Sequence, residues 1–149
     1  MCIKSWVLAG IAAATLALSG CATPTGAVFT TEAALTTGQA QVYLYRQSAL
    51  YANAQSFTVR LNQKDVGELF NGSYMQLSLA PGQHVISVKP GALGKTYEHT
   101  VQLADKQTKY LEFEMPPFLL GNAFHLGSSI APRDAQQAKT EMQGLKGVK

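Results

Sequence analysis

The sequence predicts an all-β domain, an antiparallel β-sandwich of about seven strands with a short C-terminal α-helix, behind an N-terminal signal peptide. From Gln41 onward, apolar residues recur at every second position, which is the period of a half-buried strand. Turn-forming residues recur about every ten residues, with little helix between them. Two sheets that face each other through their apolar sides accommodate this pattern.

The N-terminus has the parts of a secretory signal. Lys4 supplies a positive charge, and residues 6–18 form an apolar run too short to span a bilayer comfortably. The run ends in Leu18-Ser19-Gly20-Cys21, which resembles the lipobox of bacterial lipoproteins. This resemblance implies cleavage between Gly20 and Cys21, and an N-palmitoyl, S-diacylglycerol cysteine that anchors the chain in a lipid membrane. The alternative is an ordinary cleaved signal peptide in which Cys21 is incidental.

Removal of residues 1–20 changes the charge and cysteine content little. It takes away Lys4 and Cys2, so the count of Lys and Arg falls from 12 to 11 against 9 acids, a net charge of +2. No basic cluster remains, and we expect no nucleic-acid partner. Ala22 after the cysteine resembles the outer-membrane sorting pattern of Gram-negative lipoproteins, so we expect an outer-membrane protein that faces the periplasm.

Residues 21–40 follow the cleavage site and are rich in Thr, Ala and Gly, with Glu32 as the only charge. We expect a flexible tether that spans on the order of 25 Å as a coil. Val28, Phe29 and Leu35 allow a second arrangement, in which the segment packs on the domain formed by residues 41–149.

The seven expected strands lie near Val42–Gln47, Ser56–Asn62, Val66–Phe70, Ser73–Ala80, His84–Lys89, Tyr97–Ala104 and Lys109–Met115. Asn71-Gly72 favours a type I′ hairpin turn, and Pro81-Gly82 favours a type II turn. Pro132 is expected to begin a weakly amphipathic helix that ends near Lys146 and packs lightly. The apolar, glycine-rich residues 118–130 are either a lid over one end of the sandwich or a docking patch.

Several of these segments carry a family resemblance: Val42–Arg46 (VYLYR), Val66–Leu69 (VGEL), Asn71–Tyr74 (NGSY) and Leu79–His84 (LAPGQH). Together they resemble a family of small bacterial lipoproteins, of unknown function, that are built on a PEGA-like β-sandwich. The resemblance implies an accessory module of the cell envelope, without catalytic residues to carry over. The family often has Asp-Gly or Asn-Gly where this chain has Asn62-Gln63-Lys64-Asp65, which leaves the turn type of that hairpin open.

The residues with binding chemistry are few. Arg46 ends an aromatic strand and could hold a carboxylate or phosphate, although a surface ion pair is the more common role of such an arginine. Nearby tyrosines could offer a platform to sugar rings or to a partner protein, with sheet packing as the default. They are Tyr43, Tyr45, Tyr51 and Tyr74.

Nothing in the sequence has the spacing of a catalytic or metal site. His84, His99 and His125 are far apart and have no second ligand motif beside them, so we expect neither metal nor cofactor. Glu112 and Glu114 are expected on a solvated strand face. The sequence therefore favours a non-enzymatic module that binds or scaffolds an unknown envelope protein or glycan, by strand addition at a sheet edge. The alternative is an envelope hydrolase or glycan-modifying enzyme that uses His99 and a nearby acid.

Overall fold

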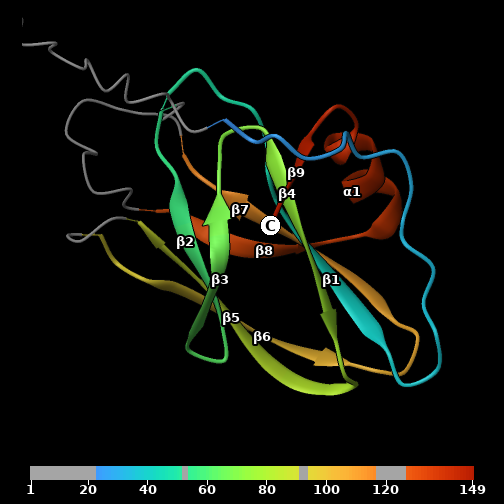
Figure 1. The fold of residues 1–149 in the computed structure, drawn as a ribbon. Coiled ribbons are helices and arrows are strands. Elements are labelled where there is room, and N and C mark those ends of the chain that lie inside the picture. The colour runs from blue at the N-terminus through green and yellow to red at the C-terminus, as the bar shows by residue number, and fades with distance from the viewer. Residues whose placement is uncertain (1–22, 52–53, 91–93, 117–126) are drawn as a thin grey trace, which may run out of the picture.

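The computed structural model describes residues 23–51, 54–90, 94–116 and 127–149, and in them two β-sheets face each other (Figure 1). The predicted signal peptide, its cleavage site and Cys21 lie outside these residues. The predicted sandwich is confirmed, with one short helix. None of the helices in the described ranges has the length and apolar character needed to cross a bilayer.

The first sheet has five strands in the order β8-β7-β1-β4-β9. Their bounds are β1 Ala40–Arg46, β4 Ser73–Leu79, β7 Thr108–Glu114, β8 Ser129–Arg133 and β9 Lys146–Val148. The second sheet has four strands in the order β3-β2-β5-β6. Their bounds are β2 Phe57–Leu61, β3 Lys64–Leu69, β5 Gly82–Pro90 and β6 Tyr97–Leu103.

The core lies between the sheets, where the apolar positions of each alternating strand meet. Val42 and Leu44 of β1 are fully buried there, as are Val59 and Val88 of the opposite sheet. β1 and β2 therefore contribute alternate side chains to this core, as the period of two predicts. The aromatic rings of Phe57 and Phe113 meet across the sheets at 5.1 Å between centroids.

The seven predicted strands correspond to β1–β7, whereas β8 and β9 were missed. β8 carries Pro132, a residue that strands tolerate at a sheet edge, which is where β8 lies. β9 is three residues long and contains Gly147, so its pattern is too short to read. Because β1 pairs in parallel with β7, and β4 with β9, the five-stranded sheet is mixed rather than purely antiparallel.

The tight hairpin turn lies elsewhere than predicted. Asn71-Gly72 joins β3 of one sheet to β4 of the other, and only Gly72 has positive φ (65°), so the predicted type I′ hairpin there is wrong. Pro81-Gly82 also joins strands of different sheets. The two-residue hairpin is Asn62-Gln63, between β2 and β3, where φ is 48° and 70°. Positive φ at both central residues is what a type I′ turn requires.

The N-terminal segment follows the edge of the five-stranded sheet. The Phe29 N–H donates to the Leu145 carbonyl at 2.9 Å, and the Gly147 N–H donates to the Ala27 carbonyl at 2.8 Å. The Phe29 side chain is buried. Of the two arrangements that the sequence allowed, a flexible coil or packing on the domain, the structure has packing at Phe29.

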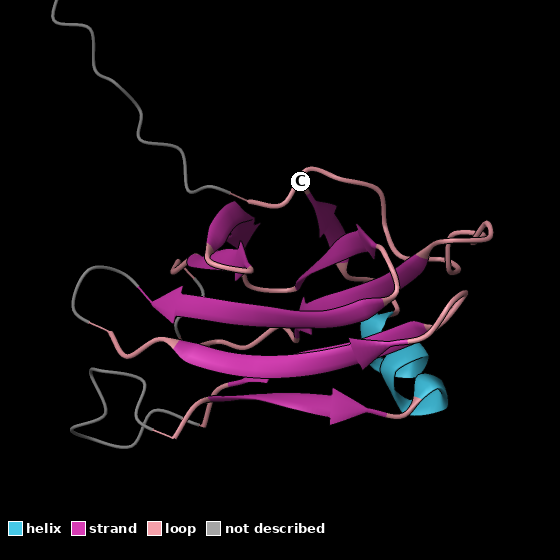
Figure 2. Cartoon of the chain, turned by 90° about the horizontal axis from the view of Figure 1, so that it is seen from below, coloured by secondary structure: helices cyan, strands magenta, loops and turns pink. Residues whose placement is uncertain are grey.

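Helix α1, Ala135–Met142, lies against the outer face of the five-stranded sheet (Figure 2). It begins three residues after Pro132, where the Asp134 carboxylate accepts a hydrogen bond from the Gln137 N–H at 3.0 Å and caps the first turn. Ala138 and Met142 are fully buried. The helix therefore packs more closely than expected, because the buried Ala138 and Met142 seat it on a sheet face made of tyrosines.

Candidate functional site

Three of the four tyrosines that the sequence singled out, Tyr43, Tyr45 and Tyr74, belong to a second core on the outer face of the five-stranded sheet, whereas Tyr51 lies beside Arg46. Tyr43 stacks on Tyr110 with centroids 5.6 Å apart, and the edge of Phe29 meets both Tyr43 and Tyr74. Tyr43 and Tyr45 are fully buried, and Tyr74 is half-buried. Tyr43 and Tyr45 therefore pack beneath α1 and the N-terminal segment, and offer no open platform to a sugar or a partner.

The hydroxyl groups of Tyr43 and Tyr45 form hydrogen bonds to the two elements that cover this core, the N-terminal segment and α1. The Ala33 N–H donates to the Tyr43 hydroxyl at 2.9 Å, and the Tyr45 hydroxyl donates to the Glu141 carboxylate of α1. Burial is the main cause that raises the pKa of both tyrosines, and the bond to Glu141 raises that of Tyr45 further. These neutral hydroxyls serve the packing of the N-terminal segment and the helix.

Arg46 points into the sandwich from the end of β1. It follows Val42 and Leu44 on the inner face and is only 3% exposed, so the expected position on the surface is wrong. Its guanidinium lies 4.9 Å from the Phe57 ring centroid and donates to the Gln55 carbonyl at 2.7 Å. Burial lowers its pKa to about 10. In the sequence, Arg46 continues the alternation of Val42 and Leu44, and this spacing indicates that its side chain points inward.

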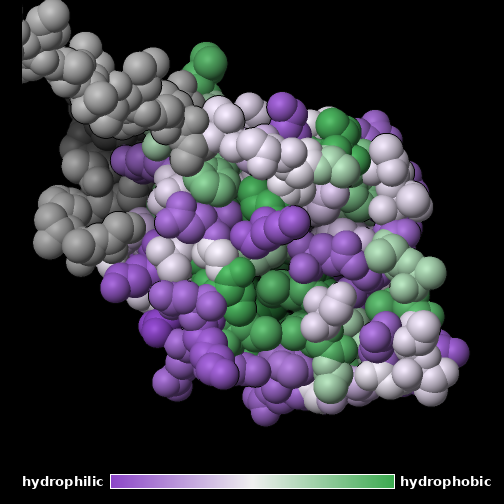
Figure 3. Space-filling view, viewed as in Figure 1, coloured by the Kyte–Doolittle hydropathy of each residue, from purple (hydrophilic) through white to green (hydrophobic). Residues whose placement is uncertain are grey.

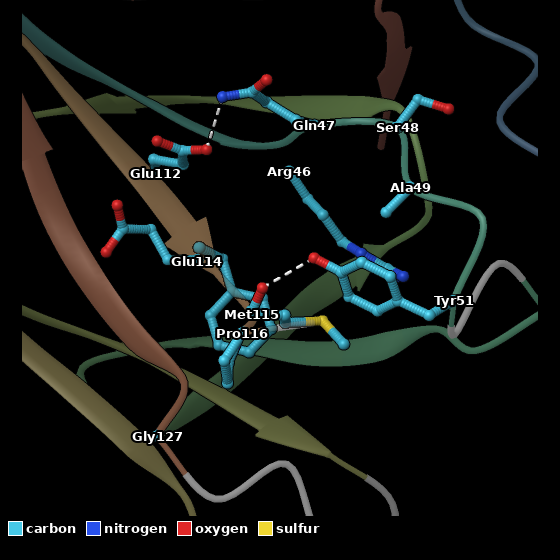
Figure 4. Close-up of a pocket in the computed structure, with 11 residues that line it drawn as sticks. Arg46, Gln47, Ser48, Ala49, Tyr51, Glu112, Glu114, Met115, Pro116 and Gly127 are labelled. Carbon is cyan, nitrogen blue, oxygen red and sulfur yellow. Dashed lines mark hydrogen bonds between the residues drawn. The ribbon is translucent and has the colours of Figure 1, made fainter. Parts of the chain in front are cut away.

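A pocket of about 440 Å³ opens beside Arg46, where the parallel strands β1 and β7 end together (Figure 4). Arg46 and Tyr51 lie on one side of it, and Gln47, Glu112 and Glu114 on the other. The rest of its lining comes from Ser48, Ala49, Phe113, Met115, Pro116 and Gly127. Sequence reasoning missed the loop after β1, because no motif marks residues 47–49.

The polar groups of this pocket are bonded to one another. Gln47 donates to Glu112 at 2.8 Å, Arg133 of β8 donates to Glu112 at 2.9 Å and also pairs with Glu114, and the Tyr51 hydroxyl donates to the Met115 carbonyl at 2.8 Å. Glu112 is buried rather than solvated as expected, because Arg133 and Gln47 cover it. Burial raises its pKa despite these bonds. Such a network holds the strand ends in place and presents few free donors to a ligand.

Two of the three histidines, His84 and His99, lie on the paired strands β5 and β6. The His84 ring bonds to the Asn62 side chain at 3.2 Å and to the Ala80 carbonyl at 2.9 Å, while His99 lies on β6 opposite Ile86. His125 is outside the described residues. Within those residues, no group of three His, Cys, Asp or Glu side chains gathers as metal ligands.

Half of β4 has an open edge. β9 pairs only with Ser73–Met75, whereas β4 continues to Leu79, and within the described ranges no strand pairs with Gln76–Leu79 on that side. A hollow of apolar side chains lies in this face of the molecule, surrounded by hydrophilic ones (Figure 3). Leu77 and Leu79 of β4 face the core, and Leu61 and Val66 of the opposite sheet pack against that core and are only partly buried.

Of the other segments that the sequence singled out, residues 118–126 lie outside the described part, and Ile130 belongs to β8 and to the core.

The comparison with protein families matches residues 36–117, from just before β1 to the end of β7, to the family described as "Protein of unknown function (DUF2846)". The chain belongs to the DUF2846 family. No curated protein and no solved structure matches it. The matched range includes Arg46 and the open edge of β4, whereas α1, β8 and β9 lie beyond it.

Proposed function

We propose that this DUF2846 protein is a lipid-anchored module of the bacterial envelope that holds an extended segment of a partner protein by strand addition to β4. The observation that carries the proposal is the unpaired edge at Gln76–Leu79 beside an apolar hollow. An extended peptide gains main-chain hydrogen bonds from such an edge, and its alternate side chains enter the adjacent hollow.

The direction of β4 limits which peptide segments can pair with its open edge. β9 runs parallel to β4 with Lys146 opposite Ser73 and Val148 opposite Met75, so a parallel peptide would continue the line of β9. Side chains of that peptide that align with Leu77 and Leu79 face the hollow, whereas those aligned with Gln76 and Ser78 face outward. The proposed partner segment is therefore extended and alternates apolar with polar residues.

A binding role also agrees with the chemistry of the Arg46 pocket. Glu112 and Glu114 are engaged by Arg133, and the Tyr51 hydroxyl is engaged by a carbonyl. A general base needs a carboxylate that is free to take a proton from a substrate. The internal bonding of these groups supports a structural role for the pocket polar groups over a hydrolytic one.

The anchor rests on the lipobox Leu18-Ser19-Gly20-Cys21, and Ala22 supports an outer-membrane location that faces the periplasm. Intact-mass spectrometry of the membrane fraction tests it. We expect the mature wild-type chain to begin at Cys21 and to carry acyl chains, and we expect Cys21→Ser to lose them. An unlipidated soluble product from both chains would refute the anchor.

Site-specific photo-crosslinking in intact cells tests the binding edge. A photoreactive residue at Ser78, which is exposed on β4, is expected to give one discrete crosslinked protein band. The matched control is Thr100, which is also exposed, on β6 of the other sheet. Because β6 is itself the last strand of its sheet, equal labelling from both positions would contradict a partner specific to the edge of β4, and a glycan product in place of a protein would contradict strand addition.

A further inference from the structure

The stretch of chain between the proposed anchor and the folded domain is short. The Gly26 N–H donates to the Gly147 carbonyl at 3.0 Å, so the backbone joins the sheet edge five residues after Cys21. A chain of five residues spans at most about 18 Å when fully extended. Residues 23–25 already lie along the domain, beside Phe70, Tyr74 and Lys149. Cys21 is therefore within about 7 Å of the position of Thr23.

We infer that one face of the domain rests against phospholipid headgroups, an inference that relies on the proposed anchoring through Cys21. This face, here called the anchor face, consists of residues 23–27, Phe70, Tyr74 and the C-terminal residues 146–149. The headgroup layer on each side of a bilayer is about 5–7 Å thick, which is no more than the reach from Thr23 to Cys21. With acyl chains inserted at Cys21, the bond of Gly26 to Gly147 keeps the sheet edge within about 18 Å of the lipidated cysteine, and residues 23–25 bring the anchor face within about 7 Å of it while they lie along the domain.

The composition of the anchor face suits this position. Lys146 and Lys149 are exposed and offer ammonium groups to lipid phosphates. Phe70 and Tyr74 are partly exposed aromatic side chains, a type that favours the boundary between water and lipid. A depression of about 670 Å³ lies among these residues, lined by both apolar and polar groups. The chemical class of its partner is thus the phospholipid headgroup layer.

Headgroup quenching tests the inference on the full, acylated chain. Cleavage removes Cys2 and acylation blocks the Cys21 thiol, so one introduced cysteine carries the only label. Thr25→Cys places a fluorophore on the anchor face, and Gln102→Cys places the same fluorophore on exposed β6 in the other sheet. The protein is reconstituted in phosphatidylcholine and phosphatidylglycerol vesicles that carry a nitroxide on the headgroup.

We expect the label at Thr25→Cys to lose most of its fluorescence and the label at Gln102→Cys to keep it. Equal fluorescence at the two positions, in protein whose intact mass shows the acyl chains, would overturn the anchor face and leave the anchoring intact. A mass without acyl chains would overturn the anchoring, and the inference with it.

Discussion

The two faces of the five-stranded sheet are both buried, but by different chemistry. The inner face, with Val42, Leu44 and Leu111, is aliphatic and meets the second sheet. The outer face, with Tyr43 and Tyr45, is aromatic and is covered by α1 and the N-terminal segment. Every residue of β1 is buried as a result. An alternation of aliphatic residues with tyrosines therefore indicates a central strand with two different cores, not a strand with one wet face.

The comparison predicts that both cores contribute to one cooperative unit. Leu44→Ala in the inner core and Met142→Ala in the outer core should each lower the free energy of unfolding by about 2–5 kcal/mol, since each leaves a cavity at a fully buried position. Urea denaturation of the mature domain measures the change. Leu50→Ala, at a residue 95% exposed, is the control and should change stability by less than about 0.5 kcal/mol. A cost for Met142→Ala no larger than that of Leu50→Ala would separate the helix from the folding unit.

The N-terminal segment should contribute through Phe29. Phe29→Ala removes a buried ring with edge contacts to Tyr43 and Tyr74, and should lower the free energy of unfolding by about 3 kcal/mol. Val28→Ala is the matched control, because the Val28 side chain is about half exposed and its backbone is equally placed. Thermal denaturation of both variants gives the comparison. Equal melting temperatures would mean that the segment adds nothing to the outer core.

The polar edge of the outer face should give a smaller, pH-dependent effect. Burial raises the folded pKa of Glu112 above its ordinary value of 4.5, so between these two values the native state binds more protons than the unfolded state. Stability then falls as pH rises through that window. Relative to Glu112→Gln, the wild-type chain is expected to gain stability as pH is lowered from 7 toward 4.5. Urea midpoints of the wild-type chain and of Glu112→Gln, measured at several pH values, give this comparison. A wild-type chain that loses stability relative to Glu112→Gln as pH is lowered would contradict the burial of Glu112.

The smallest predicted effect lies outside both cores, in the hairpin turn. Gln63 has a φ of 70°, which costs a residue with a Cβ free energy that glycine does not lose. Gln63→Gly should raise the free energy of unfolding by about 0.5 kcal/mol. Gln102→Gly, in the regular strand β6, should lower it, and a loss of stability in both variants would argue against the type I′ turn.

The sequence was most informative where the pattern is local. The period of two predicted the positions of β1–β7. The spacing of Val42, Leu44 and Arg46 also indicated that Arg46 points inward, but the expectation was a surface position, because most arginines are exposed. The partners of these strands were beyond local reading. That β7 pairs in parallel with β1, or that Arg133 of β8 covers Glu112, depends on contacts between residues distant in sequence. Asn71-Gly72 shows the same limit, because a turn sequence does not say whether the next strand stays in the sheet.

The pairing of the N-terminal segment with the sheet edge determines both the second core and the short distance between the anchor and the domain. Amide hydrogen exchange measures this pairing directly. The Phe29 and Gly147 amides donate to the Leu145 and Ala27 carbonyls. In the mature chain we expect both amides to exchange as slowly as core strand amides. Rapid exchange at Phe29 and Gly147, with slow exchange retained in β1, would show a free tether and contradict the account.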